Sequence, residues 1–222
     1  MSPPGGLPAA PHARCNRAKN PTAALTGPKR AFIDARVLRE PEQLPGLLVM
    51  TAQTFPDERG FVLQSWVKDS LESAGISAHF EQAIQTWSKR GVMRGIHFQW
   101  KPLMGKLVRC IRGAVLDVVV DVRHGSPTLG DHAMVELTGS NYRIIWVPPG
   151  FAHATFALED DTIVLYECSS QHGPGKEGGI RWNDPALGIR WPDIPAIVSA
   201  KDQVAPSLAE WLADPRSQHF RV

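Results

Sequence analysis

The chain has 222 residues, with 24 Lys and Arg against 22 Asp and Glu and a hydrophobic fraction of 43%. A net charge of +2 provides no strong basic field, so neither nucleic acid nor an anionic membrane is the expected partner. No apolar run is long enough for a transmembrane helix, and 19 Gly with 19 Pro favour a turn-rich β protein over a helical bundle.

Residues 1–30 differ in composition from the rest of the chain. They contain prolines, glycines and basic residues but no acidic residue, and they lack the continuous apolar stretch of a signal peptide. Because such a segment buries little apolar surface, we expect a disordered, Pro-rich N-terminal tail. The three cysteines leave an odd thiol, which suits a reducing compartment.

Residues 31–206 form the expected folded domain, and its first elements are short. Leu47–Met50 reads as a strand that precedes a polar turn and a second apolar segment, Phe61–Leu63. A short helix is predicted over Asp69–Ala74, closed by Gly75.

The second half of this domain is rich in strands. Two strands joined near Gly113 are predicted within residues 106–123, and further strands at Arg143–Val147 and Thr162–Cys168. Residues 207–222 are expected to be a C-terminal tail, with a helix candidate at Ser207–Ala213. Short strands broken by Gly and Pro predict an all-β sandwich or barrel with a few short helices.

The segment Gly91–Gln99 carries the first candidate site. In a regular strand His97 and Gln99 share one face and Arg94 takes the other. Arg94 and His97 can face one cavity only if the strand is irregular, and Gly95 permits a bulge there. A core histidine beside a surface arginine is the competing interpretation.

Two other segments carry candidate residues. Pro148–His153 has the pattern P-x-G-x-x-H, which resembles the second motif of cupin barrels, whose histidine often binds a metal. The first cupin motif would need two histidines at His97-Phe98-Gln99 and has one, so a metal is the less expected use. Ser199–Asp202, taken alone, predicts an exposed charged turn.

The motifs occur together in one order, and the series resembles the dTDP-4-dehydrorhamnose 3,5-epimerase family of cupins. The segments are FPDERGFVLQSW, GVMRGIHFQ, GKLVRCIRGAVLDVVVDVRHGSPTLG, NYRIIWVPPGFAHATF, VLYECS, EGGIRWNDPALGIRWP and SAKDQVAP. The resemblance covers roughly Leu47 to Pro206 and implies a cupin-type antiparallel β-barrel or jelly roll. It also implies an isomerase that epimerises a nucleoside-diphosphate 4-keto-6-deoxy sugar at C3, C5 or both, with no metal and no cofactor.

The chemistry implied by the resemblance needs a base, a cation near an enolate oxygen and an acid opposite the base. His97 matches the general base and Asp202 the carboxylate that hydrogen-bonds it. Lys106 matches the lysine near the C4 oxygen, and Tyr166 the acid on the opposite face.

Further positions match substrate-binding residues of the family. They are Arg59, Gln64, Gln82, Arg94, His153, His172, Glu177 and Lys201. Three positions depart from the family pattern: Gln64 replaces a glutamate, Ile84 an asparagine and His172 a tyrosine. Because the four catalytic matches remain, these departures predict retained enolate chemistry on an altered sugar or nucleotide.

Three other readings stay open. A ketoisomerase would use the same fold to shift the carbonyl, a metal-dependent cupin enzyme would use its histidines as ligands, and a binding barrel would catalyse nothing. The resemblance further implies a homodimer in which an N-terminal strand joins the partner's sheet, which would place Leu47–Met50 and Arg59 near the interface or in the neighbouring site. A cytoplasmic enzyme of deoxysugar biosynthesis, supplying a polysaccharide, glycolipid or glycosylated product, is the expectation.

Overall fold

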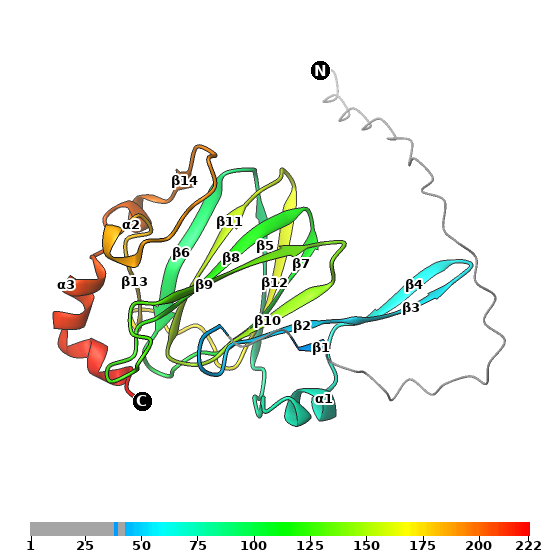
Figure 1. Cartoon of the computed structure of the whole chain (residues 1–222), viewed down its shortest axis with the longest axis horizontal. Helices are drawn as coiled ribbons and strands as arrows, with labels where there is room; N and C mark the ends of the chain where they lie inside the picture. The colour runs from blue at the N-terminus through cyan, green and yellow to red at the C-terminus, as the bar shows by residue number, and fades with distance from the viewer. Residues whose placement is uncertain (1–37, 40–42) are drawn as a thin grey trace, which may run out of the picture. The chain divides into compact units, whose positions relative to one another are not determined.

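The computed structural model of the chain describes residues 38–39 and 43–222. The chain divides into two units, residues 1–34 and 35–222, and every described residue lies in the second. The expected N-terminal tail, residues 1–30, therefore lies outside the described residues. Figure 1 shows two facing sheets with short helices beside them. The prediction of an all-β fold with few helices is confirmed.

The first sheet has six strands in the order β1-β2-β10-β7-β12-β5, and all neighbouring pairs are antiparallel. They are β1 (Leu38–Arg39), β2 (Leu48–Thr51), β5 (Gln82–Ser88), β7 (Lys106–Arg112), β10 (Arg143–Val147) and β12 (Thr162–Cys168). The strands predicted for residues 143–147 and 162–168 match β10 and β12.

The second sheet has the order β13-β6-β11-β8-β9. Its strands are β6 (Val92–Gln99), β8 (Ala114–Asp121), β9 (His132–Thr138), β11 (Phe151–Ala157) and β13 (Glu177–Gly179), and β14 (Ile197–Val198) runs parallel to one end of β6. The predicted junction at Gly113 is where the chain passes from β7 in the first sheet to β8 in the second.

Apolar side chains from both sheets fill the space between them. Val108, Val119 and Ile145 are fully buried there. In β11 every residue is buried, because one face meets the opposite sheet and the other meets a second apolar cluster. A strand covered on both faces reads as a continuous apolar run, as this one does.

The C-terminal segment forms much of that second cluster. It contains α3 (Leu208–Ala213) and the 3₁₀ helix η2 (Pro215–His219), and another 3₁₀ helix, η1 (Pro185–Leu187), precedes them. Trp211 packs on Phe98 with ring centroids 4.4 Å apart, and Phe220 is 1% exposed. Residues 207–222 thus complete the core, and the tail boundary expected at residue 206 does not separate them from it.

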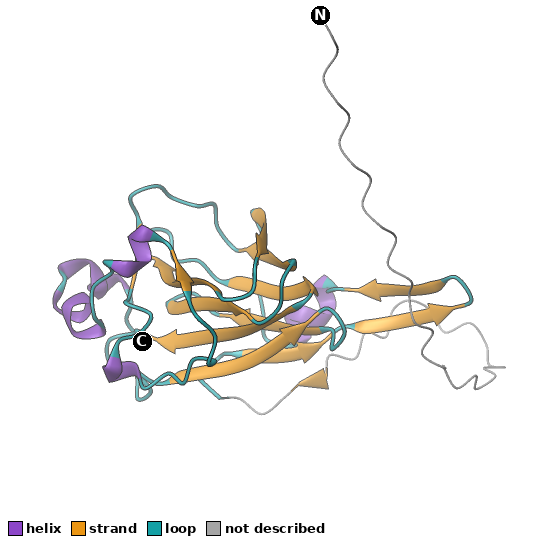
Figure 2. Ribbon diagram, turned by 90° about the horizontal axis from the view of Figure 1, so that it is seen from above, coloured by secondary structure: helices purple, strands orange, loops and turns teal. Residues whose placement is uncertain are grey.

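The outer face of the first sheet is covered by α1 (Lys68–Ser73), which lies one residue from its predicted position. Beside it, β3 (Gln53–Asp57) and β4 (Gly60–Gln64) form a separate hairpin that pairs with neither sheet. Figures 1 and 2 show this hairpin extending away from the two sheets. Its Phe61 and Val62 are more than half exposed.

Candidate active site

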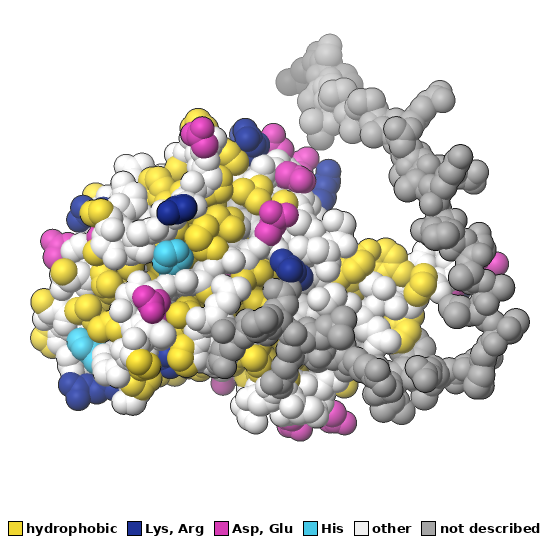
Figure 3. All heavy atoms as spheres, in the orientation of Figure 1, with side chains coloured by type: hydrophobic (Ala, Val, Ile, Leu, Met, Phe, Trp, Pro, Cys, Tyr) yellow, Lys and Arg dark blue, Asp and Glu magenta, His cyan; other side chains and the backbone are white. Residues whose placement is uncertain are grey.

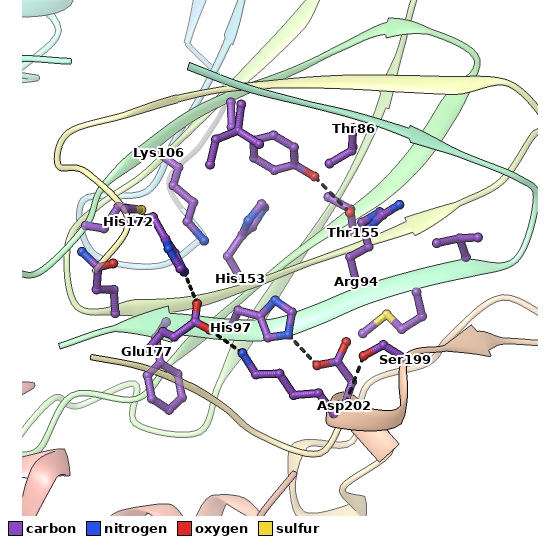
Figure 4. Close-up of a pocket in the computed structure, with 18 of the residues that line it drawn as sticks. Thr86, Arg94, His97, Lys106, His153, Thr155, His172, Glu177, Ser199 and Asp202 are labelled. Carbon is purple, nitrogen blue, oxygen red and sulfur yellow. Dashed lines mark hydrogen bonds and ion pairs between the residues drawn. The ribbon is translucent and has the colours of Figure 1, made fainter. Parts of the chain in front are cut away.

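A cavity of about 550 Å³ opens between the two sheets. Its volume falls within the range of small-molecule sites. Nine of the twelve predicted site residues line it: Arg94, His97, Lys106, His153, Tyr166, His172, Glu177, Lys201 and Asp202. Figure 4 shows many of their side chains directed toward one space.

A bulge in β6 brings Arg94 and His97 into the same cavity. Between the pairs His153–His97 and Thr155–Arg94, two residues of β6, Gly95 and Ile96, lie opposite one residue of β11, Ala154. Gly95, with a φ of +137°, lies at this bulge, and a Cβ there would stand 2.4 Å from the Cβ of Ala154. Only glycine fits, so the irregularity predicted from Gly95 is present.

His97 is held by a carboxylate from the helix α2 (Ala200–Gln203). Its Nε2 lies 2.6 Å from Oδ1 of Asp202. Burial opposes ionisation of Asp202, but hydrogen bonds from His97 and Ser199 outweigh it, and its pKa lies below the ordinary value. An ionised carboxylate only accepts, so Nε2 carries the hydrogen and Nδ1 is the nitrogen that can take a proton.

The prediction of an exposed turn at residues 199–202 is wrong for Asp202, which is 4% exposed. Ser199 caps α2, its Oγ accepting from the backbone N–H of Asp202. The helix therefore begins at a fixed point, and its first turn directs the carboxylate toward β6 rather than toward water.

A second histidine–carboxylate pair lies beside the first. His153 Nε2 is 2.9 Å from both carboxylate oxygens of Asp117 on β8, and both side chains are buried. Sequence reasoning missed Asp117. The available signal was an acidic residue inside the apolar run AVLDVVVD, since a buried carboxylate requires a partner.

Lys106, at the start of β7, faces the same cavity from the first sheet. Burial lowers the pKa of its ammonium group, and the charges of Asp117 and Glu177 offset this only in part. Within residues 38–39 and 43–222 no carboxylate forms an ion pair with Lys106, so its charge is available to an anionic ligand.

Tyr166, on β12, lies in the wall of the first sheet, whereas His97 belongs to the second. Its hydroxyl is 3.2 Å from Oγ1 of Thr155 on β11. Burial raises the pKa of Tyr166 to about 12, so the phenol carries its proton at neutral pH. Thr155 was not predicted, since FAHATFA reads simply as a buried strand.

A chain of polar contacts crosses the mouth of the cavity. Glu177 binds His172 Nε2 through one oxygen and Lys201 Nζ through the other, each at 2.6 Å. Burial opposes ionisation of Glu177, but these two partners outweigh it and hold its pKa below the ordinary value. Gln82 accepts from the backbone N–H of His172 and so supports the mouth without lining the cavity.

Arg59 and Gln64 lie away from the cavity of their own chain. Arg59 is at the turn of the β3–β4 hairpin, is 83% exposed and pairs with Asp57. The side-chain oxygen of Gln64 is buried and has no hydrogen-bond partner among the described residues. Apolar side chains gather over this hairpin in Figure 3.

The described parts of the chain hold no group of three or more His, Cys, Asp or Glu side chains that could bind a metal ion. Within the same ranges, no helix has the length and apolar character needed to span a bilayer.

Comparison with known proteins identifies the family. The family model of dTDP-4-dehydrorhamnose 3,5-epimerase matches residues 41–210. The curated dTDP-4-dehydrorhamnose 3,5-epimerase of Salmonella typhimurium is 42% identical over 173 residues, which cover 76% of this chain and 94% of the relative.

Solved structures agree with this result. The epimerase RmlC of Legionella pneumophila, in complex with dTDP-4-keto-L-rhamnose, matches with a TM-score of 0.78 and 36% identity, covering 82% of this chain and 97% of its own. ChmJ of Streptomyces bikiniensis, a 3'-monoepimerase in complex with dTDP-quinovose, matches with a TM-score of 0.75 and 33% identity, covering 82% and 92%. The predicted cupin-type fold and the predicted isomerase class are confirmed, and the chain belongs to the dTDP-4-dehydrorhamnose 3,5-epimerase family.

Proposed function

We propose that the chain epimerises a dTDP-linked 4-keto-6-deoxy sugar at the carbons beside its ketone. The observation that carries the proposal is the placement of two groups on opposite walls of one cavity: the carboxylate-backed His97 on the second sheet and the protonated Tyr166 on the first. Inversion of a carbon requires a base on one side and an acid on the other.

The first step removes a proton from the carbon next to the ketone. Nδ1 of His97 takes the proton, and the C–H electron pair forms a carbon–carbon double bond while the C4 oxygen becomes negative. Asp202 stabilises the imidazolium that results. Lys106 supplies positive charge at the C4 oxygen, in a setting shielded from water where such charge has a large effect.

The second step returns a proton from the other side. The phenol O–H of Tyr166 breaks, the enolate pair forms a new C–H bond, and the C4 oxygen becomes a ketone again. His97 then holds the first proton and Tyr166 is left as a phenolate. Exchange with water resets both groups, so the reaction needs no metal and no redox cofactor.

The remaining cavity residues are proposed to hold the substrate. Arg94 offers a guanidinium fork for phosphate oxygens, although it now donates to Ser88 and to the carbonyl of Trp87. His153, His172, Glu177 and Lys201 are proposed to contact the sugar and diphosphate. The dTDP-linked ligands in the RmlC and ChmJ structures support dTDP as the nucleotide.

The active form is proposed to be a homodimer. Arg59 and Gln64 match family binding residues yet lie on a hairpin away from their own cavity. The hairpin also exposes the apolar side chains of Phe61 and Val62 to water, which is energetically unfavourable unless another surface packs on them. A second copy that receives this hairpin would bury the apolar residues and gain Arg59 at its own site.

Solvent exchange tests the proposed reaction. The protein would be incubated in D₂O with dTDP-4-keto-6-deoxyglucose, with and without a chelator, and C3 and C5 followed by NMR. Deuterium at both carbons, unaffected by the chelator, is the result expected of a 3,5-epimerase. Deuterium at one carbon would restrict the reaction to that carbon. No exchange with dTDP-, GDP- or CDP-linked 4-keto sugars would refute the enolate mechanism.

A further inference from the structure

The hydroxyl of Tyr166 is held by a residue from the opposite sheet. Oγ1 of Thr155, on β11, lies 3.2 Å from the Tyr166 hydroxyl, and Figure 4 marks this contact within the cavity. Thr155 is 4% exposed and Tyr166 is 9% exposed. Thr155 stands two residues after His153, so both side chains project from the same face of β11 into the cavity.

This contact matters most after the proton has left. A neutral phenol can accept a hydrogen bond from Thr155 and keep its own hydrogen for the substrate. A phenolate needs a donor, and a buried anion without one is costly. The threonine hydroxyl can donate in both states, whereas a carbonyl or a carboxylate at this place would compete for the phenol hydrogen.

The surroundings favour this role. Arg94 is paired with Thr155 across β6 and β11, so a positive charge lies near the same end of the cavity. The hydrogen bond of Thr155 and the charge of Arg94 both act to lower the pKa of Tyr166, against the larger opposing effect of burial. Thr155 therefore supports loss of the phenol proton where burial resists it.

We propose that Thr155 is a positioning residue for Tyr166, which aims the phenol hydrogen at the sugar and donates a hydrogen bond to the phenolate left behind. This inference rests on the proposed function, in which Tyr166 is the acid. It assigns Thr155 to the second half of the reaction only, since the contact is with Tyr166 and not with His97.

The enolate can be protonated on either face, and the two outcomes distinguish enolate formation by the base from inversion by the acid. It can regain a hydrogen from His97 on the face that lost it, and when the imidazolium proton has first exchanged with D₂O this gives deuterium uptake without inversion. It can instead take a proton from Tyr166, which gives inversion. The ratio of inversion to exchange therefore reports the acid, independently of the rate at which the base forms the enolate.

The test compares Thr155→Val, Thr155→Ala and Thr155→Ser with the unaltered chain, using dTDP-4-keto-6-deoxyglucose in D₂O and NMR. With the hydroxyl removed in the Val or Ala variant, we expect inversion to fall roughly 10- to 100-fold while deuterium uptake falls less than about threefold. The Ser variant keeps the hydroxyl and is expected to restore the ratio. Thr162→Val is the matched control, because Thr162 is a fully buried threonine of β12 whose hydroxyl binds backbone carbonyls outside the cavity.

Two results would overturn the inference. One is that neither inversion nor exchange changes in the Val and Ala variants. The other is an equal fall of inversion and exchange, which would assign Thr155 a structural role, and Thr155→Ser provides a folded comparison if the larger changes unfold the chain. If the unaltered chain itself takes up no deuterium, the proposed function fails instead, so the two failures are distinguishable.

Discussion

His97 and His153 stand directly opposite each other on the paired strands β6 and β11, yet each binds a different carboxylate. The His97 side chain is 37% exposed and the His153 side chain 4%. Of these two histidines, His97 alone combines a carboxylate at one ring nitrogen with open access to the cavity. This difference supports the proposal that His97 is the base and that His153, with Asp117, is a fixed wall of the site.

The Asp202→Asn change should impair the base without removing it. An amide in place of the carboxylate no longer stabilises the imidazolium and can favour the wrong tautomer of His97. We expect kcat to fall roughly 100-fold or more with KM changed little, measured by steady-state epimerisation. Asp193→Asn, at an exposed position outside the cavity, is the control and should match the unaltered chain. Equal kcat values in the two variants would contradict the account.

The alkaline limit of activity should belong to Lys106. The ammonium is charged below its pKa, which burial places under the ordinary 10.5, so its contribution is lost as pH rises through that lowered value. Tyr166, with a pKa of about 12, still holds its proton at that pH. As pH rises, kcat/KM should therefore begin to decrease at a pH lower than 10.5.

Lys106→Arg provides the check on this assignment. Arginine remains charged across the same range, so the alkaline fall should move to higher pH even if the maximal rate is reduced. If the alkaline decrease of kcat/KM occurs at the same pH in the Lys106→Arg variant, a group other than Lys106 controls it.

The homodimer proposal predicts complementation between defective chains. Arg59→Ala should weaken substrate binding and His97→Ala should abolish catalysis. When the two are co-expressed, half of the dimers are hybrids with one intact site, so about one quarter of the normal activity should return. Co-expression of Arg94→Ala with His97→Ala is the control, because both residues line the same chain's cavity and no hybrid has an intact site. No recovery in the first pair would indicate that Arg59 does not serve a neighbour.

Ile84 should limit which sugars are accepted. It lies beside Tyr166 on β5, lines the cavity and is 36% exposed, so it presents an apolar surface where the family usually has an asparagine. Ile84→Asn should raise kcat/KM for dTDP-4-keto-6-deoxyglucose roughly tenfold by restoring a hydrogen bond to a sugar hydroxyl. Ile84→Leu keeps this part of the cavity wall apolar and should not raise kcat/KM. A fall in kcat/KM with Asn would mean that the natural substrate uses the apolar wall.

The sequence predicts much of this architecture because its signals are local. Thr162–Cys168 alternates side chains between core and sheet surface, and Gly95 marks the bulge that joins Arg94 to His97. Asp202 could be found only through family resemblance, since its burial depends on where α2 docks. Asp117 was missed because its partner His153 lies on a strand distant in sequence. Thr155 was missed because its partner Tyr166, although on the next strand, belongs to the other sheet, and no local pattern shows that the two strands face each other across the cavity.

The central claim is that base and acid act from opposite walls of the cavity, and one measurement tests it most directly. Deuterium uptake and inversion at C3 and C5 would be followed by NMR in D₂O for the unaltered chain, His97→Gln and Tyr166→Phe. The account predicts that the His97 variant loses both uptake and inversion, while the Tyr166 variant keeps uptake at the first carbon attacked and loses inversion. Uptake that survives without His97, or inversion that survives without Tyr166, would contradict it.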